Sequence, residues 1–218
     1  TLLIDVLTAV IGVGITATIR VRSYERRITP GNTGLKEIKD GFRYLKDNQL
    51  IKRLLLFQIT ILFLVSPSAF LTPLMVSRTF GSEVWRLTAS EMTYSLGMVL
   101  GGILIASWGG FKKRMNTTMA AGAIYGLIMI GLGNAGVFLL YLLLNTAIGV
   151  VSPCYNAPIT VTIQEKVSPG MQGRIFSFMQ IATSCALPFG MVVFGPLADV
   201  MPVQHLLNAA GLMILILS

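Results

Sequence analysis

Apolar runs long enough to cross a membrane recur along this chain of 218 residues. A helix needs about 20 mostly apolar residues to span the hydrocarbon core of a bilayer. With 54% hydrophobic and only 12% charged residues, the chain cannot build the water-facing surface of an ordinary globular domain. We therefore predict an all-α, polytopic membrane protein, a helix bundle with about seven transmembrane helices, the last incomplete. The predicted spans are residues 1–19, 54–76, 87–108, 116–132, 137–163, 175–198 and 206–218.

The basic residues are distributed unevenly between the connections of these spans. The net charge of +8 would suit a nucleic-acid partner if the cations gathered on one soluble face. Instead, fifteen of the seventeen Lys and Arg residues fall in alternate connections, and residues 20–53 alone hold ten. Cytoplasmic loops carry such an excess, so residues 20–53 are placed in the cytoplasm. The expected partner is the lipid bilayer, and no nucleic acid is expected.

Residues 20–53 form a long polar connection with one predicted amphipathic helix at 33–47. Its apolar positions recur at spacings of three and four, which is typical of a helix with one apolar face. These positions are Leu35, Ile38, Phe42 and Leu45. Two interpretations remain open: a helix lying in the plane of the inner leaflet with its cations facing anionic lipid, or a solvated linker helix packed on a bundle.

Several short segments resemble one family of transporters. They are residues 35–45 (LKEIKDGFRYL), 167–169 (VSP), 173–177 (GRIFS) and 195–199 (GPLAD). Together with the helix pattern, they resemble the macrolide-efflux-like branch of the major facilitator superfamily, a branch that also includes siderophore exporters. The resemblance covers essentially the whole chain.

The resemblance implies where the chain belongs in a twelve-helix transporter. Residues 1–19 would be the last helix of the N-terminal half, 20–53 the central loop and 54–218 the C-terminal bundle. The missing N-terminal half of the same polypeptide is therefore an expected partner. The fragment alone is not expected to transport.

The same resemblance implies cytoplasmic gating loops. In the family, a Gly is followed by an Asp four residues after it, by a second Gly seven residues after it, and then by basic residues. Ala106 replaces the Asp here, so a latch through that carboxylate is in doubt. The implied gating residues are Gly102, Gly109, Lys112, Lys113, Arg114, Gly173 and Arg174.

Polar side chains inside the predicted spans are candidates for a substrate pathway. These are Gln58, Glu91, Tyr94, Asn145, Asn156, Gln180 and Ser184. Glu91 is the sharpest candidate, because a carboxylate within a membrane span is costly and marks a cation site or a proton carrier. Alternatively, Glu91 reaches the outer interface or pairs with Arg86. Asn145 and Gln180 can instead form hydrogen bonds between neighbouring helices.

Small residues four apart recur on three spans and predict close approach of helices. The pairs are Gly97 and Gly101, then Gly122 and Gly126; Ala182, Ala186 and Gly190 continue the pattern on a third span. Tight static packing and a surface that slides during transport both fit this pattern.

The sequence contains no group of residues suited to enzyme chemistry. It has one histidine, His205, and two cysteines, and these form no ligand cluster or nucleophilic triad. No phosphate-binding loop is present, so ATP-driven pumping is not encoded. No enzyme activity, catalytic residue, metal or cofactor is therefore expected.

The resemblance implies a secondary active transporter. The expected function is proton-coupled export of a small amphipathic drug such as a macrolide by alternating access, with a proton or another coupling ion as partner. The alternatives are a siderophore or metabolite exporter of the same fold, and a non-transporting membrane scaffold or receptor. The expected location is the cell membrane, as a multi-pass protein of the bacterial inner membrane.

Overall fold

The computed structural model describes residues 13–14, 18 and 34–218, with side chains from residue 41 onward in the last of these stretches. The chain divides into two compact units, Thr1–Lys36 and Glu37–Ser218. The expected helix at 1–19 lies almost wholly outside the described residues, as do the loop residues 19–33.

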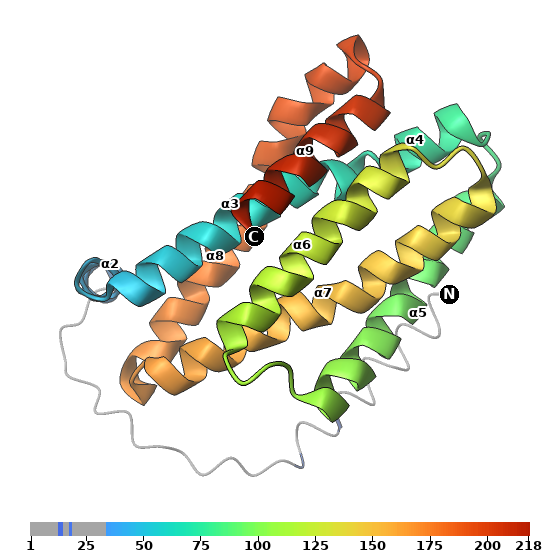
Figure 1. Ribbon diagram of the computed structural model, residues 1–218. Helices are drawn as coiled ribbons and strands as arrows, with labels where there is room; N and C mark the ends of the chain where they lie inside the picture. The colour runs from blue at the N-terminus through green and yellow to red at the C-terminus, as the bar shows by residue number, and fades with distance from the viewer. Residues whose placement is uncertain (1–12, 15–17, 19–33) are drawn as a thin grey trace. The chain divides into compact units, whose positions relative to one another are not determined.

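The described part of the chain consists of helices joined by short connections, and it contains no strand (Figure 1). This confirms the predicted all-α class. After α2 (Gly34–Asp47), which crosses the boundary between the units, the second unit contains the remaining helices. They are α3 (Gln49–Phe70), α4 (Thr72–Thr79), α5 (Val84–Trp108), α6 (Arg114–Gly133), α7 (Phe138–Lys166), α8 (Pro169–Val200) and α9 (Val203–Leu217).

Five segments within the described residues are long and apolar enough to cross a bilayer. The helices α3 and α4 together form one of them, Gln49–Thr79, and α5, α6, α7 and α8 are the others. The helix α9 is apolar but has only 15 residues. The protein is therefore a multi-pass membrane protein.

Several helices extend beyond the predicted apolar runs. The largest difference is in α8, which begins at Pro169 rather than at residue 175. Pro169 occupies the first turn, where its missing N–H costs no hydrogen bond. Apolarity marks only the part of a helix inside the hydrocarbon core, so a helix that continues into the headgroup region is longer than its apolar run.

The first span of the bundle is interrupted at Leu71, between α3 and α4. Pro73 has no N–H to donate to the carbonyl of Ala69, and its ring crowds that carbonyl. The hydroxyl of Thr72 donates instead to the carbonyl of Ser68, and the N–H of Leu71 donates to Pro67 O at 2.9 Å. The chain therefore keeps its direction through the break with most of its backbone groups satisfied.

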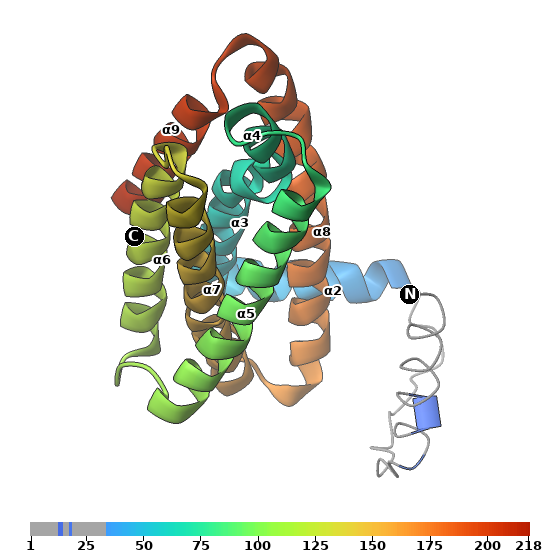
Figure 2. The ribbon, with the colours of Figure 1, turned by 90° about the vertical axis from the view of Figure 1, so that its right-hand side faces the viewer.

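Each helix from α3 to α9 packs against particular neighbours in the second unit. The helix α5 lies along α7, α6 lies against both α7 and α9, and α3 lies against α8 and α9 (Figure 2). Gly97 and Gly101 of α5 touch α7, where an added Cβ would meet the backbone of Thr146 and Val150 respectively.

Two further helix pairs meet at small residues. Gly126 of α6 faces the backbone of Gly211 of α9, and Gly190 of α8 faces Ser66 of α3. These contacts, with those of Gly97 and Gly101, confirm the close approach predicted from the small-residue pattern. In lipid, where hydrophobic attraction between helices is absent, such backbone proximity provides much of the packing energy.

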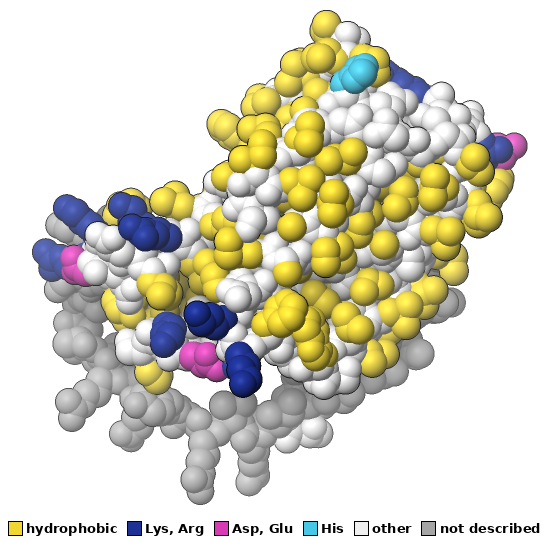
Figure 3. Space-filling view, viewed as in Figure 1, with side chains coloured by type: hydrophobic (Ala, Val, Ile, Leu, Met, Phe, Trp, Pro, Cys, Tyr) yellow, Lys and Arg dark blue, Asp and Glu magenta, His cyan; other side chains and the backbone are white. Residues whose placement is uncertain are grey.

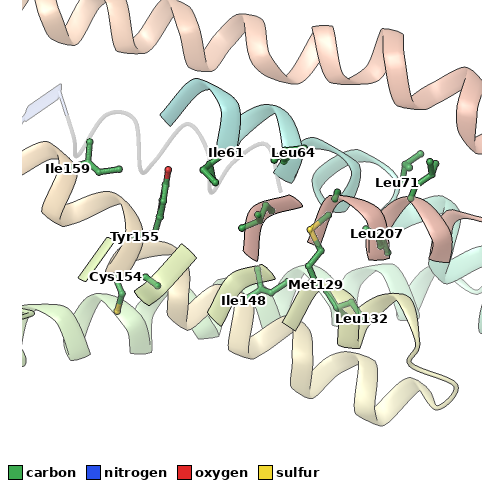
Figure 4. Close-up of a cluster of buried hydrophobic side chains, with 14 of the residues drawn as sticks. Ile61, Leu64, Leu71, Met129, Leu132, Ile148, Cys154, Tyr155, Ile159 and Leu207 are labelled. Atoms are coloured by element: carbon green, nitrogen blue, oxygen red, sulfur yellow. The ribbon is translucent and has the colours of Figure 1, made fainter. Parts of the chain in front are cut away.

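Apolar side chains fill the space between these helices. Figure 4 shows Ile61 and Leu64 of α3 near Tyr155 of α7, with Met129 of α6 and Leu207 of α9 further along the cluster. Outside this core, apolar side chains cover the surface of the spans (Figure 3). Lysines and arginines gather at the end that carries the α5–α6 connection, and the histidine lies at the opposite end (Figure 3). This surface suits a protein whose sides face hydrocarbon.

Candidate functional site

A small polar cavity lies among four spans of the bundle. Its volume is ≈ 190 Å³, and its walls come from α3 and α4, α5, α6 and α7. Glu91, Tyr94 and Asn145, three of the predicted pathway residues, share this cavity. The full lining is Val65, Ser68, Ala69, Thr72, Ser90, Glu91, Tyr94, Tyr125, Leu132, Asn145 and Ile148.

Glu91 has no ion pair with any described residue. The predicted alternative, a pair with Arg86, is wrong, because Arg86 Nη2 lies 3.2 Å from Glu83 Oε2 instead. The guanidinium of Arg86 also lies 5.4 Å from the ring centre of Trp85 and 5.9 Å from that of Phe138. Arg86 is thus held near the end of the helix, and Glu91 is left as a carboxylate without a cationic partner in the described part of the bundle.

Asn145 connects α7 to α5 beside this cavity. It is buried, and its Nδ2 donates to the carbonyl of Ser90 at 2.6 Å and lies 3.4 Å from Thr93 Oγ1. This confirms, for Asn145, the alternative in which a buried amide bonds a neighbouring helix. The same bond fixes the wall of the cavity next to Glu91.

A second, more apolar cavity adjoins the first. Its volume is ≈ 300 Å³, and it shares Val65, Tyr94 and Tyr125 with the Glu91 cavity. The hydroxyl of Tyr94 lies 3.4 Å from Ser152 Oγ, and the hydroxyl of Tyr125 lies 3.4 Å from Ser68 Oγ. The remaining lining residues are Ile61, Leu62, Met98, Gly122, Ser152, Pro153, Tyr155 and Asn156.

Two polar atoms next to this second cavity lack hydrogen-bond partners. Gln58 Nε2 donates to Asn156 Oδ1 at 3.3 Å, but Gln58 Oε1 and the hydroxyl of Tyr155 have no hydrogen-bond partner among the described residues. Gln58 and Tyr155 are both only 6% exposed. A buried polar atom without a partner is costly, so these atoms favour a ligand or water that completes their bonds.

The two remaining pathway candidates lie elsewhere. Gln180 and Ser184 are exposed on α8 and line neither cavity. Their participation in a pathway stays a prediction.

The predicted gating loop between α5 and α6 is held by defined contacts. Gly109 ends α5 with φ of 73° and Gly110 follows with φ of 80°, a left-handed conformation that favours glycine. The N–H of Phe111 donates to Thr117 Oγ1 at 2.8 Å. These contacts turn the chain from α5 into α6.

Arg114 fixes this loop to the end of α7. Its Nη2 lies 2.6 Å from Glu165 Oε1 and its Nε lies 3.1 Å from Glu165 Oε2. Alanine at residue 106 supplies no carboxylate for the latch of the family, and Arg114 pairs instead with Glu165 within the same bundle. Lys112 and Lys113 are exposed beside it.

The other predicted gating residues have few contacts. Gly102 lies within α5, and a Cβ added there would meet no atom within 4 Å. Gly173 and Arg174 lie in the first turns of α8, where Arg174 Nη1 is 3.0 Å from Met171 Sδ. A gating role for these residues stays a prediction.

Several cavity residues were missed by sequence reasoning. Ser68, Thr72 and Ser90 carry hydroxyl groups within helices, where Ser and Thr often bond only the backbone of their own helix. Tyr125 and Tyr155 also line the cavities. Tyr125 and Tyr155 were the easiest of these residues to predict, since the hydroxyl of a tyrosine deep in a span needs a polar partner. Among the described residues, no three His, Cys, Asp or Glu side chains form a group able to hold a metal.

Comparison with known proteins gives a consistent family assignment. The model of the Major Facilitator Superfamily matches residues 1–191. Macrolide efflux protein A of Streptococcus pyogenes is 28% identical over 215 residues, which cover 97% of this chain and 53% of that protein. Macrolide efflux protein A of Enterococcus faecalis is 28% identical over 191 residues, covering 86% of this chain and 59% of that protein. The chain thus spans about half the length of these relatives, and no solved structure matches it.

Proposed function

Because this chain belongs to the major facilitator superfamily of transporters, we propose that it forms part of a proton-coupled exporter of an amphipathic drug such as a macrolide. The exporter would work by alternating access, with the N-terminal half of the same polypeptide completing the pathway. The two relatives named as macrolide efflux proteins support drug export, and the membership confirms the resemblance noted in the sequence. The chain is a multi-pass protein of the bacterial cell membrane.

The observation that carries the proposal is the position of Glu91. Glu91 lines a polar cavity at an exposed position of α5, and it forms no ion pair with a described lysine or arginine. An ionised carboxylate within a membrane span is costly, so such a group tends to take up a proton or bind a cation. Hydroxyl groups of Ser68, Thr72 and Tyr94 surround the same cavity and suit the passage of a proton.

The adjoining cavity is suited to binding the substrate of such an exporter. Ile61, Leu62 and Met98 give it apolar walls, while Tyr155 and Asn156 add uncharged hydrogen-bonding groups. Ligand sites typically combine mostly apolar walls with a few placed polar groups. Because Tyr94 lines both cavities, protonation at Glu91 and occupation of the second cavity would act on a shared wall.

The test is transport by the complete polypeptide in proteoliposomes. We expect a labelled macrolide to move when a pH gradient is applied and to stop moving when the gradient is collapsed. Glu91→Gln should reduce gradient-driven transport by about tenfold or more, while drug binding in the absence of a gradient changes little. The matched control is Glu83→Gln, which removes a carboxylate on the same end of the bundle but outside the cavity.

Each outcome separates the alternatives. If neither a macrolide nor another amphipathic compound moves with the gradient, the exporter proposal fails and a non-transporting scaffold or receptor is favoured. Movement of a siderophore in place of a macrolide favours the alternative substrate. Unchanged coupling in Glu91→Gln removes Glu91 from the mechanism.

A further inference from the structure

A third cavity lies away from both parts of the candidate site, between α2, α3 and α8. Its volume is ≈ 580 Å³. Among the described residues, the lining is apolar apart from two lysines and includes no carboxylate. The lining is Phe42, Leu45, Lys46, Lys52, Leu55, Leu56, Ile59, Phe178, Ile181 and Ala182.

The helix α2 touches α8 at Phe178, at one edge of this cavity. A Cβ added to Gly41 would lie 2.6 Å from a ring atom of Phe178, so this glycine allows the helix to approach. The rings of Phe42 and Phe178 meet edge to face with their centres 6.3 Å apart. Phe42 nevertheless remains 68% exposed. The cavity is therefore a formed groove with an apolar side chain still open to a further partner.

The two lysines give this groove one charged edge. Lys46 lies in the last turn of α2 and Lys52 in the first turn of α3. Both are exposed, and neither forms an ion pair with a described residue. The groove thus presents cations beside an apolar trough, an arrangement complementary to an anionic headgroup joined to a hydrocarbon chain.

The location favours a lipid of the inner leaflet as the occupant. Lys46 and Lys52 belong to the strongly basic connection that the distribution of cations places in the cytoplasm. Anionic phospholipids in the cytoplasmic leaflet attract basic residues at this depth. A cationic amphipathic drug would instead be repelled by the described lining, which offers two positive charges and no carboxylate.

We propose that this groove binds one molecule of an anionic phospholipid. One acyl chain lies along Leu55, Leu56 and Ile181, and the phosphate lies between Lys46 and Lys52. Such a lipid would join the connecting helix α2 to the transmembrane helices α3 and α8. The proposal requires no transport activity, so its outcome is separate from that of the proposed function.

The test is native mass spectrometry of the complete polypeptide, released from detergent after incubation with phosphatidylglycerol or with phosphatidylcholine of the same acyl chains. We expect phosphatidylglycerol to be retained preferentially. With about a fivefold contribution from each lysine near an anionic headgroup, Lys46→Gln with Lys52→Gln should weaken retention by about 25-fold. The matched control is Lys112→Gln with Lys166→Gln, which removes two exposed cations that do not line the groove.

A second variant separates loss of binding from loss of folding. Ala182→Leu keeps both lysines but fills part of the trough, and it should lower the retention of both lipids. Size-exclusion profiles confirm that each variant is folded. Equal retention of the two lipids, or an equal loss in the Lys112 and Lys166 control, would overturn the proposal. Full retention in the Lys46 and Lys52 variant or in Ala182→Leu would do the same.

Discussion

The variant Gly97→Ala tests the close contact between α5 and α7. A Cβ at Gly97 would lie 3.0 Å from the Cα of Gly149 and closer still to the carbonyl oxygen of Thr146. Both neighbours are backbone atoms of α7, so no side-chain rotation can relieve the collision. The two helices must separate, or the variant must lose stability.

The expected magnitude follows from comparison with Gly102→Ala on the same helix. A Cβ at Gly102 meets no atom within 4 Å. Both variants gain the helix preference of alanine over glycine, about 0.5–1 kcal/mol, and this gain cancels in the comparison. Only Gly97→Ala forces an extra carbon into a packed contact, which costs about 1–3 kcal/mol. Gly97→Ala should therefore be less stable than Gly102→Ala by about 1–3 kcal/mol.

The assay is reversible unfolding of the complete polypeptide in mixed micelles with increasing SDS, followed by circular dichroism. The free energies of unfolding of the two variants are compared under identical conditions. A difference below about 0.5 kcal/mol would contradict the close approach of α5 and α7, since free-energy changes of separate substitutions add only to within about that amount.

Two further predictions concern polar contacts between helices. Asn145→Leu removes the hydrogen bond to the Ser90 carbonyl and should lower the free energy of unfolding by about 0.6–1.7 kcal/mol. The same SDS titration measures this loss. An unchanged free energy of unfolding would mean that this bond does not hold α5 to α7. Glu165→Gln frees Arg114 and should make trypsin cleave at Lys112 and Lys113 faster, by roughly twofold, than in the Glu83→Gln control. Equal cleavage rates would show that the pair does not restrain the α5–α6 loop.

The helical type of the described spans was open to prediction from the sequence, because hydropathy over about 20 residues reports directly on burial in hydrocarbon. The break between α3 and α4 at Leu71 lies between Pro67 and Pro73, the residue type that most often interrupts a helix. The start of α8 at Pro169 was not predictable in this way, since its first turns lie beyond the apolar run.

The grouping of polar side chains was less predictable than the spans. Glu91, Tyr94 and Asn145 share one cavity because α5 and α7 lie side by side, a contact suggested by the glycines of α5. Gln180 and Ser184 looked equivalent in the sequence but line neither of these two cavities. A helix that is apolar on all sides carries no periodic signal of which face turns inward, so its rotation is decided by packing alone.

The interruption at Leu71 also makes this residue a hinge point within the span Gln49–Thr79. Bending a continuous helix breaks backbone hydrogen bonds, but Pro73 has already removed the bond to Ala69, and Thr72 already occupies the carbonyl of Ser68. Bending here would therefore cost less than bending elsewhere in the span. Ser68, Ala69 and Thr72 all line the Glu91 cavity, so the least rigid point of the span coincides with one wall of that cavity. Tilting α4 by a few degrees would change the cavity's width without repacking the α5–α7 contact.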